Sequence, residues 1–534
     1  MRIAVIGGGP GGLFFATLVR RADPSVEVTV FERNRADDAF GFGVVFSDRT
    51  LAGIHAADPV LREALDAHGR HWQDIEVRLK GERIRCGGNG MAAIARRVLL
   101  ALMQTRAREV GARLCFQTEV DSADLAGYDL VVAADGSGSR TRERLAVEFG
   151  STVDVAAAKF IWFGTDYLFD GLTFVHERGP HGVFAVHGYP ISAHASTFIV
   201  ECDEPSWRAA GLDRFDLTQP PGPSDLDSKE YLEKLFAEQI DGHRLLVNNS
   251  RWGSFRTRRT PRWHTFQPRP VVLVGDAAHT AHFSVGSGTK MAMEDAMALS
   301  AALVEHGYDL PAALPAYEAT ARVSVEAIQG SARPSLGWWE RFGQYHDAFE
   351  PWQFAYHFLS RSITDARLAR RAPDFVGASH ERWRATHGAE PLASPLSLAG
   401  RSVPGRAVVV TCLDAERAVA RFPGADLPLA AGAEPGRSQW GAWIAAPEDE
   451  SGLPAAEGVM ARLVESGPAL VAVHGGNAYT RGLLAEHARL RHRAPALVVD
   501  DGLDRDRATT MILSGRADLV GGAAETVESW TVTR

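Results

Sequence analysis

The chain has little cysteine and no long uninterrupted apolar run. Its four cysteines lie in or beside apolar segments without any C-x-x-C spacing, which excludes a disulfide framework or a cysteine metal site and predicts buried free thiols. No apolar stretch approaches the roughly 20 residues that cross a bilayer. The first expected strand begins at residue 2, which leaves no room for a signal peptide. We therefore expect a cytoplasmic protein that does not bind membranes.

Basic clusters are also scarce. The net charge is −9 and no block of Lys or Arg interrupts the sequence, so there is no electrostatic signature of nucleic-acid binding. A serine hydrolase would need G-x-S-x-G after a strand, and the nearest segment, Gly136–Ser139, lacks that spacing. The ordinary content of 45% hydrophobic and 23% charged residues indicates a globular protein, and 534 residues allow two or three domains.

A dinucleotide-binding fingerprint opens the chain. The apolar residues 3–6 run directly into glycines spaced G-x-G-x-x-G. Gly7 permits a tight turn, Gly9 lets the backbone approach a pyrophosphate, and Gly12 lets the following helix pack on the sheet. Glu32 stands twenty positions beyond Gly12 at the end of a second apolar strand, where it can accept hydrogen bonds from ribose hydroxyls. Strand, turn, helix and distant glutamate together predict a bound dinucleotide.

Two further segments identify the family. Residues 128–136 form an apolar strand that ends in Asp135-Gly136, and residues 271–276 form another that ends in Gly275-Asp276. With the fingerprint, and in this order, they resemble the single-component FAD-dependent aromatic hydroxylases related to para-hydroxybenzoate hydroxylase. The resemblance covers residues 1 to about 360.

The resemblance implies a set of FAD contacts. Asp276 is expected to bind the ribityl chain, and the backbone near Gly286 and Gly288 to face the isoalloxazine, where a helix N-terminus stabilises negative charge on reduced flavin. Arg96 resembles the family arginine near the pyrophosphate, the alternative being a solvated helix arginine. The expected cofactor-binding residues are Gly7, Gly9, Gly12, Glu32, Arg33, Arg96, Asp135, Gly275, Asp276, Gly286 and Gly288.

Two departures point to a narrower branch. Most members carry a proline and an asparagine in the loop after the Gly-Asp motif, and here those positions are Phe283 and Lys290. Residues 279–289, with segments 41–48, 159–165 and 196–202, resemble the branch of salicylyl-CoA 5-hydroxylases, 2-aminobenzoyl-CoA monooxygenases and pigment hydroxylases of violacein synthesis.

The expected fold class is α/β, with a Rossmann-like FAD-binding domain, an inserted β-sheet domain for the substrate and a small α/β C-terminal domain. The sheet is predicted from the apolar runs 160–164, 172–176, 183–187 and 197–201, and helices are predicted near 287–306 and 314–330. The predicted boundaries are 1–155 and 265–385 for the FAD-binding domain, 156–264 for the insertion and 386–534 for the C-terminal domain.

The C-terminal domain resembles the two ends of an Old Yellow Enzyme-type flavin barrel, at residues 395–406 and 513–521. The segment is shorter than the ~200 residues of an eight-stranded barrel. We therefore predict a degenerate segment that binds no FMN and serves stability or assembly; a small active reductase module is the alternative.

The resemblance also implies the chemistry. NADPH or NADH reduces FAD, dioxygen adds at flavin C4a, and the resulting hydroperoxyflavin hydroxylates an aromatic ring, which we expect to belong to an aryl thioester of coenzyme A or of a carrier protein. The alternatives are an indolic or other natural-product substrate and a non-catalytic FAD protein. The arginine-rich stretch 251–262 could bind the coenzyme A phosphates or form a solvated loop. A homodimer is possible.

Three side chains are candidates to polarise the substrate, a general-base task that suits a pKa near neutrality. His282 lies in the flavin-facing loop, where it either reaches the substrate or binds the backbone. His187 and Tyr189 lie on the predicted sheet, and one of them is expected to line the pocket unless both are structural. His279 is expected to be structural, behind the Gly-Asp turn.

Overall fold

The computed structural model describes residues 1–218, 222–286, 288–434 and 439–531. The chain divides into two compact units, Met1–Gly343 and Gln344–Arg534, which are described separately. The division lies upstream of the boundary at 385/386 that the sequence predicts, because the helices between these positions pack with the C-terminal unit.

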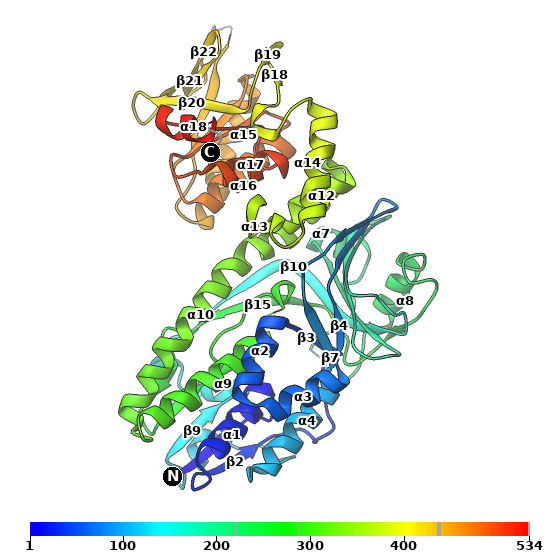
Figure 1. Cartoon of the computed structure of the whole chain (residues 1–534), viewed down its shortest axis with the longest axis vertical. Helices are drawn as coiled ribbons and strands as arrows, with labels where there is room; N and C mark the ends of the chain where they lie inside the picture. Colours follow the sequence, from blue (N-terminus) through cyan, green and yellow to red (C-terminus); the bar gives the residue numbers. More distant parts are fainter. Residues whose placement is uncertain (219–221, 287, 435–438, 532–534) are drawn as a thin grey trace. The chain divides into compact units, whose positions relative to one another are not determined.

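A six-stranded sheet forms the nucleotide-binding part of the first unit, and all its strands except the edge strand β16 run parallel. Helix α1 (Pro10–Ala22) packs against α9 (Gly288–Glu305), and α4 (Arg96–Glu109) packs on α1. The strand order is β16 (His264–Thr265), β17 (Val271–Leu273), β9 (Leu130–Ala133), β1 (Arg2–Ile6), β2 (Glu27–Phe31) and β8 (Arg113–Cys115). This order confirms the predicted Rossmann-like fold. Figure 1 labels β2 and β9 of this sheet together with α1, α4 and α9.

A second, mostly antiparallel sheet forms the other part of the first unit. All four predicted strands are present, and β5 and β6, which precede the predicted insertion in sequence, extend this sheet because β5 pairs in parallel with β11. The order is β14 (Leu245–Leu246), β10 (Thr152–Thr165), β13 (Ser196–Cys202), β12 (Gly182–Pro190), β11 (Leu172–Gly179), β5 (Ile75–Leu79) and β6 (Glu82–Cys86), and β15 (Gly253–Arg259) also pairs with β10.

Strand alternation gives this sheet two different faces. One face carries Phe163, Phe184, Val186 and Val200, which form an apolar core with Leu232 of α8 (Leu226–Leu235). Residues of the opposite parity, which include the predicted His187 and Tyr189, therefore point to the other side of the sheet.

Smaller elements complete the unit. A three-stranded sheet has the order β3 (Gly43–Ser47), β7 (Met91–Ala95) and β4 (Arg70–Trp72). The remaining helices of four or more residues are α2 (Asp48–Ala57), α3 (Pro59–His68), α5 (Arg140–Arg144), α6 (Ala146–Phe149), α7 (Glu204–Ala209) and the long α10 (Leu310–Trp339).

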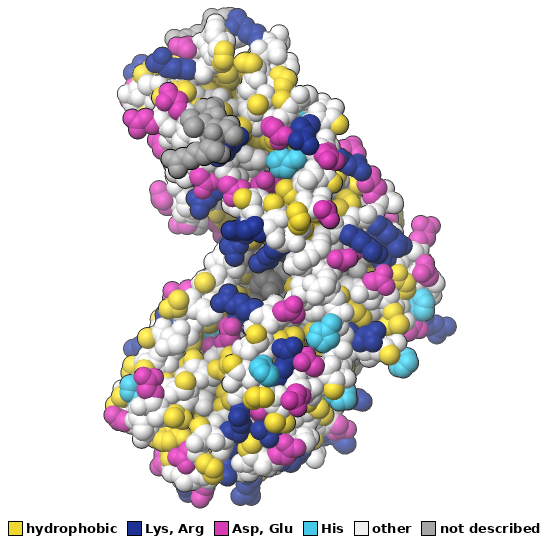
Figure 2. Space-filling view, viewed as in Figure 1, with side chains coloured by type: hydrophobic (Ala, Val, Ile, Leu, Met, Phe, Trp, Pro, Cys, Tyr) yellow, Lys and Arg dark blue, Asp and Glu magenta, His cyan; other side chains and the backbone are white. Residues whose placement is uncertain are grey.

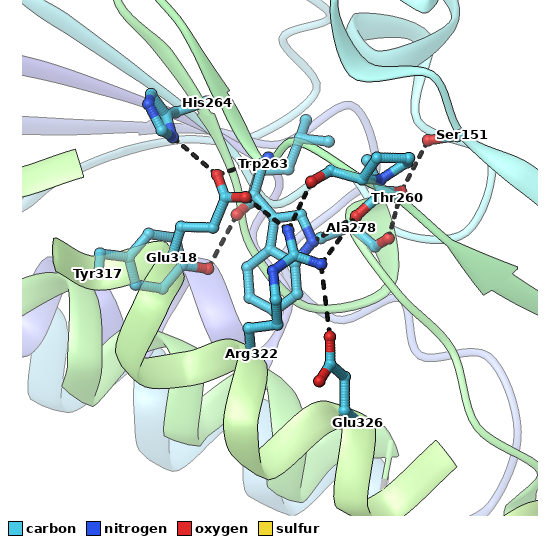
Figure 3. A network of polar contacts seen from close by, with 11 residues as sticks. Ser151, Thr260, Trp263, His264, Ala278, Tyr317, Glu318, Arg322 and Glu326 are labelled. Atoms are coloured by element: carbon cyan, nitrogen blue, oxygen red, sulfur yellow. Dashed lines mark hydrogen bonds and ion pairs between the residues drawn. The ribbon is translucent and has the colours of Figure 1, made fainter. Parts of the chain in front are cut away.

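A network of polar contacts links α10 to strands β16 and β17 of the nucleotide-binding sheet (Figure 3). The Glu318 carboxylate accepts hydrogen bonds from the Trp263 backbone N–H at 2.9 Å and lies 2.8 Å from Nδ1 of His264. Tyr317 donates to the Leu273 carbonyl at 3.0 Å, and Thr260 donates to the Ala278 carbonyl. The network therefore holds both ends of the segment that carries the Gly-Asp motif.

The second unit contains a closed barrel of seven strands. They are β20 (Ala407–Cys412), β21 (Arg417–Phe422), β22 (Ala425–Ala430), β23 (Gly441–Ala445), β24 (Val471–His474), β25 (Ala496–Val499) and β26 (Leu519–Gly522). Only β21 runs antiparallel to its neighbours, and the other six strands run parallel to one another, so the ring closes with seven strands instead of the eight of a flavin barrel. A small α/β C-terminal domain is confirmed.

Apolar side chains fill the barrel interior, and helices surround it. Val408, Leu429, Trp443, Leu497 and Leu519 are among the buried residues of this core. The helices are α11 (Phe342–Ala348), α12 (Pro351–Leu359), α13 (Asp365–Ala369), α14 (Pro373–His387), α15 (Leu453–Glu465), α16 (Ala478–Leu490), α17 (Arg505–Leu513) and α18 (Ala524–Thr531), and the hairpin β18 (Leu396–Leu398) and β19 (Arg401–Val403) precede the barrel.

The cysteines only partly follow the prediction. Cys86 and Cys202 are buried, Cys115 is half-buried and Cys412 is exposed, because it is the last residue of β20, where the strand leaves the barrel. All four are free thiols. Among the described residues, no helix combines the length and the apolar character needed to cross a bilayer.

Candidate active site

The glycine turn after β1 has the geometry of a phosphate cradle. Gly7 has φ +109°, and a Cβ added to it would lie 2.3 Å from the Ala134 carbonyl oxygen. A Cβ added to Gly12 would lie 2.2 Å from the Gly7 carbonyl oxygen. A Cβ at Gly9 would meet no atom within 4 Å. The two outer glycines are therefore required by the fold, whereas Gly9 faces open space at the N-terminus of α1, where backbone N–H groups favour an anion.

A cavity of about 140 Å³ opens beside this turn. Glu32 lines it, and its carboxylate accepts hydrogen bonds from the backbone N–H groups of Gly8 and Asn34, each at 2.8 Å. Arg33 is exposed and does not line the cavity. The lining residues are Gly8, Gly9, Pro10, Glu32, Asn34, Arg35, Asp38, Ala39, Phe40, Arg96, Leu100, Gln104 and Phe116. Arg96, which the sequence analysis selected, therefore lines the same cavity as the glycine turn.

The Gly-Asp turn is built around a buried pair behind it. Gly275 has φ +64° and donates its N–H to Oδ2 of Asp295 at 2.8 Å, and Nε2 of His279 lies 2.7 Å from the same oxygen. His279 and Asp295 are both 1% exposed, so His279 supports the turn from behind. Asp276 follows directly after Gly275 in this supported turn.

Three polar side chains near this turn have spare hydrogen-bonding capacity. Among the described residues, neither the Asp276 carboxylate nor the Arg96 guanidinium forms a hydrogen bond, and Oδ1 of Asp135 is buried without a partner. Burial raises the pKa of Asp276 despite the opposing charges of His279 and Arg96, and burial likewise lowers the pKa of Arg96. Unpartnered buried polar groups are costly, so this arrangement fits a polar ligand such as FAD.

The flavin loop then approaches β3. Gly286 has φ +61°, and a Cβ there would lie 3.2 Å from Cγ1 of Val45; α9 begins at Gly288, where a Cβ would meet nothing within 4 Å. Tyr189 is buried, with its hydroxyl 3.4 Å from the Gly43 carbonyl oxygen, and burial raises the pKa of Tyr189 to about 12. Tyr189 is therefore a neutral hydroxyl group at neutral pH.

The other two catalytic candidates meet at a carboxylate that the sequence analysis did not select. Nε2 of His187 lies 2.5 Å from Oε2 of Glu201, and Nε2 of His282 lies 3.2 Å from Oε1 of the same residue. All three are at most 4% exposed. In the β12–β13 register, Glu201 pairs with Ala185 and His187 pairs with Ile199, so His187 and Glu201 are diagonal neighbours on one face.

The two imidazoles control the charge of Glu201. Burial alone would raise the pKa of this carboxyl group, but His282 and His187 outweigh burial and lower its pKa to about 2. Glu201 is therefore a carboxylate at neutral pH. It holds the two histidines, one from the sheet and one from the flavin loop, in a single polar cluster.

Half-buried aromatic rings surround this cluster. Phe283 lies at their centre, with ring centroids 5.0 Å from Phe160, 5.4 Å from His187 and 4.3 Å from His282. Phe255 lies 5.0 Å from His282, and Trp162 lies 6.3 Å from Phe283. The side chains of Phe160, Trp162, Phe255 and Phe283 are partly exposed, so they offer an apolar surface of the kind that a planar ring contacts.

The sequence contains one signal for Glu201. It is the only charged residue of β13, in the otherwise uncharged run Ser-Thr-Phe-Ile-Val-Glu-Cys. A lone carboxylate in a buried strand requires a partner. The partner itself depends on strand register and loop position, which the sequence pattern does not define.

The arginine-rich stretch 251–262 is only partly available for a ligand. Arg258, Arg259 and Arg262 are each bound to a backbone carbonyl or a carboxylate. Arg256 is exposed and, within the described part of the chain, forms no ion pair. On the face shown in Figure 2, Lys and Arg side chains are interspersed with Asp and Glu, so this face presents no broad basic surface.

Comparison with known proteins agrees with this geometry. The "FAD binding domain" family model matches residues 126–330. A salicyloyl-CoA 5-hydroxylase from Streptomyces sp is 55% identical over 529 residues, which cover 98% of this chain and 100% of that protein. A 3-hydroxy-4-methyl-anthranilyl-[aryl-carrier protein] 5-monooxygenase from Streptosporangium sibiricum is 36% identical over 64% of this chain and 90% of that protein.

Solved structures agree on the fold. The crystal structure of a p-nitrophenol 4-monooxygenase from Pseudomonas putida superposes with a TM-score of 0.53 at 17% sequence identity, covering 70% of this chain and 97% of that one. The predicted fold class is confirmed by this likeness.

Proposed function

The chain belongs to the family of FAD-dependent aromatic monooxygenases that contains salicyloyl-CoA 5-hydroxylase, and on that premise we propose that it hydroxylates the ring of an aryl-coenzyme A thioester, with salicyloyl-CoA as substrate. One observation carries this proposal. The similarity to the Streptomyces enzyme covers 98% of this chain, whereas the similarity to the carrier-protein enzyme covers 64%. Only the first of these matches is long enough to include both units.

FAD is the cofactor, and the geometry supports an assignment of its contacts. The pyrophosphate would lie at Gly7, Gly9 and the N-terminus of α1, and Asp276 would bind the ribityl chain. Arg96 would compensate the phosphate charge. Bound FAD, reduced by NADPH or NADH, supplies the activation of dioxygen and the transfer of one oxygen atom to the ring.

The aromatic side chains around Phe283 would position the substrate ring and exclude water from it. His187 and His282 would polarise the ring hydroxyl group, which increases the electron density of the ring carbon that is attacked. Tyr189, with a pKa raised to about 12, would act as a neutral hydrogen-bond donor beside Arg96. Arg256 would contact the coenzyme A phosphates. Dioxygen as co-substrate and a homodimeric state are parts of the same proposal.

The test is NAD(P)H oxidation by the purified flavoprotein, with mass analysis of the product. Salicyloyl-CoA, 2-aminobenzoyl-CoA and the two free acids are compared. Stimulation by a thioester but not by its acid, with a product heavier by one oxygen atom, is the expected result. Equal stimulation by the free acid would contradict a coenzyme A-dependent substrate.

A carrier-protein thioester is the second candidate, because the Streptosporangium relative acts on an aryl-carrier protein according to its name. The same aryl group is offered on a phosphopantetheinylated carrier protein and on coenzyme A. A higher kcat/KM with the carrier would favour this candidate. If tryptophan-derived indoles were hydroxylated and no thioester were, the indolic alternative would replace both. If no substrate stimulated oxygen consumption by the FAD-loaded protein, a non-catalytic FAD protein would be favoured.

A further inference from the structure

The cluster at Glu201 extends beyond its two histidines. Nδ1 of His282 lies 2.8 Å from Oγ of Ser284, and the Ser284 backbone N–H points to the same nitrogen at 3.4 Å. Oγ of Ser284 lies 2.8 Å from Oγ of Ser335 on α10. A chain of hydrogen-bonding groups therefore runs from β12 through Glu201 and the flavin loop to α10.

These contacts constrain the histidine tautomers. Because Ser284 offers its N–H to Nδ1 of His282, the proton of a neutral His282 belongs on Nε2, where it is donated to Glu201. Glu201 also contacts Nε2 of His187 with its other oxygen. Both imidazoles are thus oriented by one carboxylate, and each ring contacts a different oxygen of Glu201.

Among the described residues, the side chains that pair with Glu201 are imidazoles, which can release a proton, and not lysine or arginine, which would carry a fixed charge. Among the described residues, the titratable groups that interact with Glu201 are His187 from β12, His282 from the flavin loop and the neighbouring Cys202 thiol. No Lys or Arg forms an ion pair with it within the described residues. The recorded partners of Glu201 that can carry a positive charge are therefore the two imidazoles.

From this geometry we propose that Glu201 is the positioning residue of a two-histidine proton acceptor that ionises the ring hydroxyl group of the bound substrate. The inference rests on the proposed function, because it assumes an aryl substrate with a ring hydroxyl group. The inference assigns Glu201 a role in hydroxylation and explains why His187 and His282 lie together, since both contact this carboxylate.

The proton balance is simple. The O–H bond of the substrate breaks, its electron pair remains on oxygen, and a new N–H bond forms on an imidazole of the pair. Glu201 stabilises the resulting imidazolium on whichever ring accepts the proton, because each of its oxygens contacts a different ring. No oxidant or reductant is consumed in this step. The ionised ring oxygen donates electron density to the para carbon.

The experiment compares the holoenzyme with its Glu201→Gln variant, in which an amide of nearly equal size removes the charge. Glu177→Gln is the matched control, because Glu177 is a half-buried carboxyl group of the same sheet that contacts Gln239 and not the histidines. Salicyloyl-CoA is bound to oxidised enzyme without NAD(P)H, so that no turnover occurs. The phenol-to-phenolate absorbance change is then titrated with pH.

We expect the bound ligand in the wild type and in Glu177→Gln to ionise at a pH at least one unit lower than in Glu201→Gln. We also expect kcat for hydroxylation to fall at least tenfold in Glu201→Gln and to recover partly at high pH, while KM changes by less than threefold. The methyl ether 2-methoxybenzoyl-CoA, which has no ring proton to lose, should bind to all three proteins within twofold.

Identical ionisation midpoints in wild type and Glu201→Gln would overturn the inference. Retention of FAD absorbance reports whether the variant is folded, and if it is not, His282→Gln provides the same comparison from the loop side of the cluster. Imidazole titrations by NMR in the ligand-free holoenzyme give a second readout, and loss of Glu201 should lower both midpoints. A wild-type protein that binds no aryl thioester would overturn the proposed function itself, a result distinct from thioester binding with unshifted ionisation.

Discussion

Each unit of the chain contains a buried glutamate between cationic or titratable partners, Glu201 in the first and Glu486 in the second, and the partners of these two differ in kind. In the first unit, Glu201 contacts two imidazoles. In the second unit, Glu486 accepts a hydrogen bond from the Tyr345 hydroxyl at 2.6 Å and lies 3.4 Å from Nε of Arg516. Both carboxyl groups have their pKa lowered to about 2. At Glu201 the two imidazoles outweigh the effect of burial, and at Glu486 His357, Arg516 and Tyr345 together outweigh it.

The difference lies in where the countercharge resides. His357 also contacts Glu486, but burial and the nearby Arg516 lower the pKa of this histidine to about 4, so it is neutral at pH 7. Arginine does not give up its proton under ordinary conditions, so the charge that balances Glu486 is fixed. The same lowered pKa therefore belongs to a carboxylate with an arginine partner in the barrel unit and to a carboxylate whose recorded ion-pair partners are imidazoles in the flavin unit.

The surroundings of the two carboxylates support this distinction. Both sets of side chains are buried, but the Glu201 cluster also contacts partly exposed rings such as Phe283 and Phe255, whereas Phe349, which contacts Tyr345 and His357, is itself buried. The barrel interior beyond them is filled by apolar side chains such as Trp443 and Leu497. Perturbed ionisation marks a functional site only where a ligand can reach it.

The largest effect that we expect is the loss of FAD, which should follow a substitution in the flavin unit but not one in the barrel unit. We expect Asp276→Ala to purify without FAD and, at an FAD concentration of about 100 times the wild-type Kd, to lack the roughly 2.7 kcal/mol by which bound ligand stabilises the fold. The measurement is the flavin absorbance of purified protein with its thermal unfolding. Trp443→Ala, which removes a buried ring from the barrel, is the control that should lose stability but keep FAD. A yellow Asp276→Ala protein with full FAD would contradict the assignment of Asp276.

The next largest effect is the loss of unfolding free energy when the charge of Glu486 or Glu201 is removed. Glu486→Gln leaves Arg516 buried without a countercharge and should lower the free energy of unfolding of the second unit by about 3–5 kcal/mol. Glu201→Gln should cost less, about 1–3 kcal/mol, because the imidazoles can become neutral. Urea unfolding followed by circular dichroism measures both. Equal losses would remove the distinction between fixed and transferable countercharges.

Acid should destabilise both units through the same two carboxylates. A carboxyl group whose folded-state pKa is about 2 contributes stability that is fully present above its ordinary value near 4.5 and is lost as the pH falls from there toward 2. We expect the urea midpoint to fall in that window, and the fall to be smaller in Glu201→Gln and Glu486→Gln. A pH dependence unchanged in both variants would show that other groups control acid unfolding.

The smallest effect concerns the substrate's phosphates. Arg256→Ala should raise KM for an aryl-CoA thioester by roughly three- to tenfold, about 1 kcal/mol, with kcat unchanged, because the side chain is exposed and screened by solvent. Arg259→Ala, on the same strand but paired with Asp154, is the control. An equal change in KM for a short N-acetylcysteamine thioester, which lacks phosphates, would exclude a phosphate contact.

Local motifs were the part of the site that could be predicted from the sequence. The roles of Gly7 and Gly12 follow from the covalent geometry of a strand–turn–helix unit, and the structure shows the close contacts that demand glycine there. His187 and His282 were selected by position, but Glu201, which joins them, was not. A strand pattern shows which residues share a face, but not which residue of the next strand lies diagonally opposite.

The barrel unit shows the same limit at the level of a domain. Its length predicted a degenerate segment too short for eight strands, and the single antiparallel strand β21, paired between β20 and β22, allows a ring of seven strands to close. Similarly, β5 and β6 join the substrate-side sheet from outside the predicted insertion. Pairings between distant segments depend on tertiary packing, so neither a composition shift nor an apolar run identifies them.

The sequence by itself determined the flavin fingerprint, the α/β class and the family, because these depend on residues close together in the chain whose backbone requirements are local. Only the tertiary structure decided which charges meet. It brought Glu201 between a sheet histidine and a loop histidine, and Glu486 beside Arg516. The physical reason is that ionisation depends on burial and on neighbours within a few ångströms, and both are set by the packing of segments far apart in the chain.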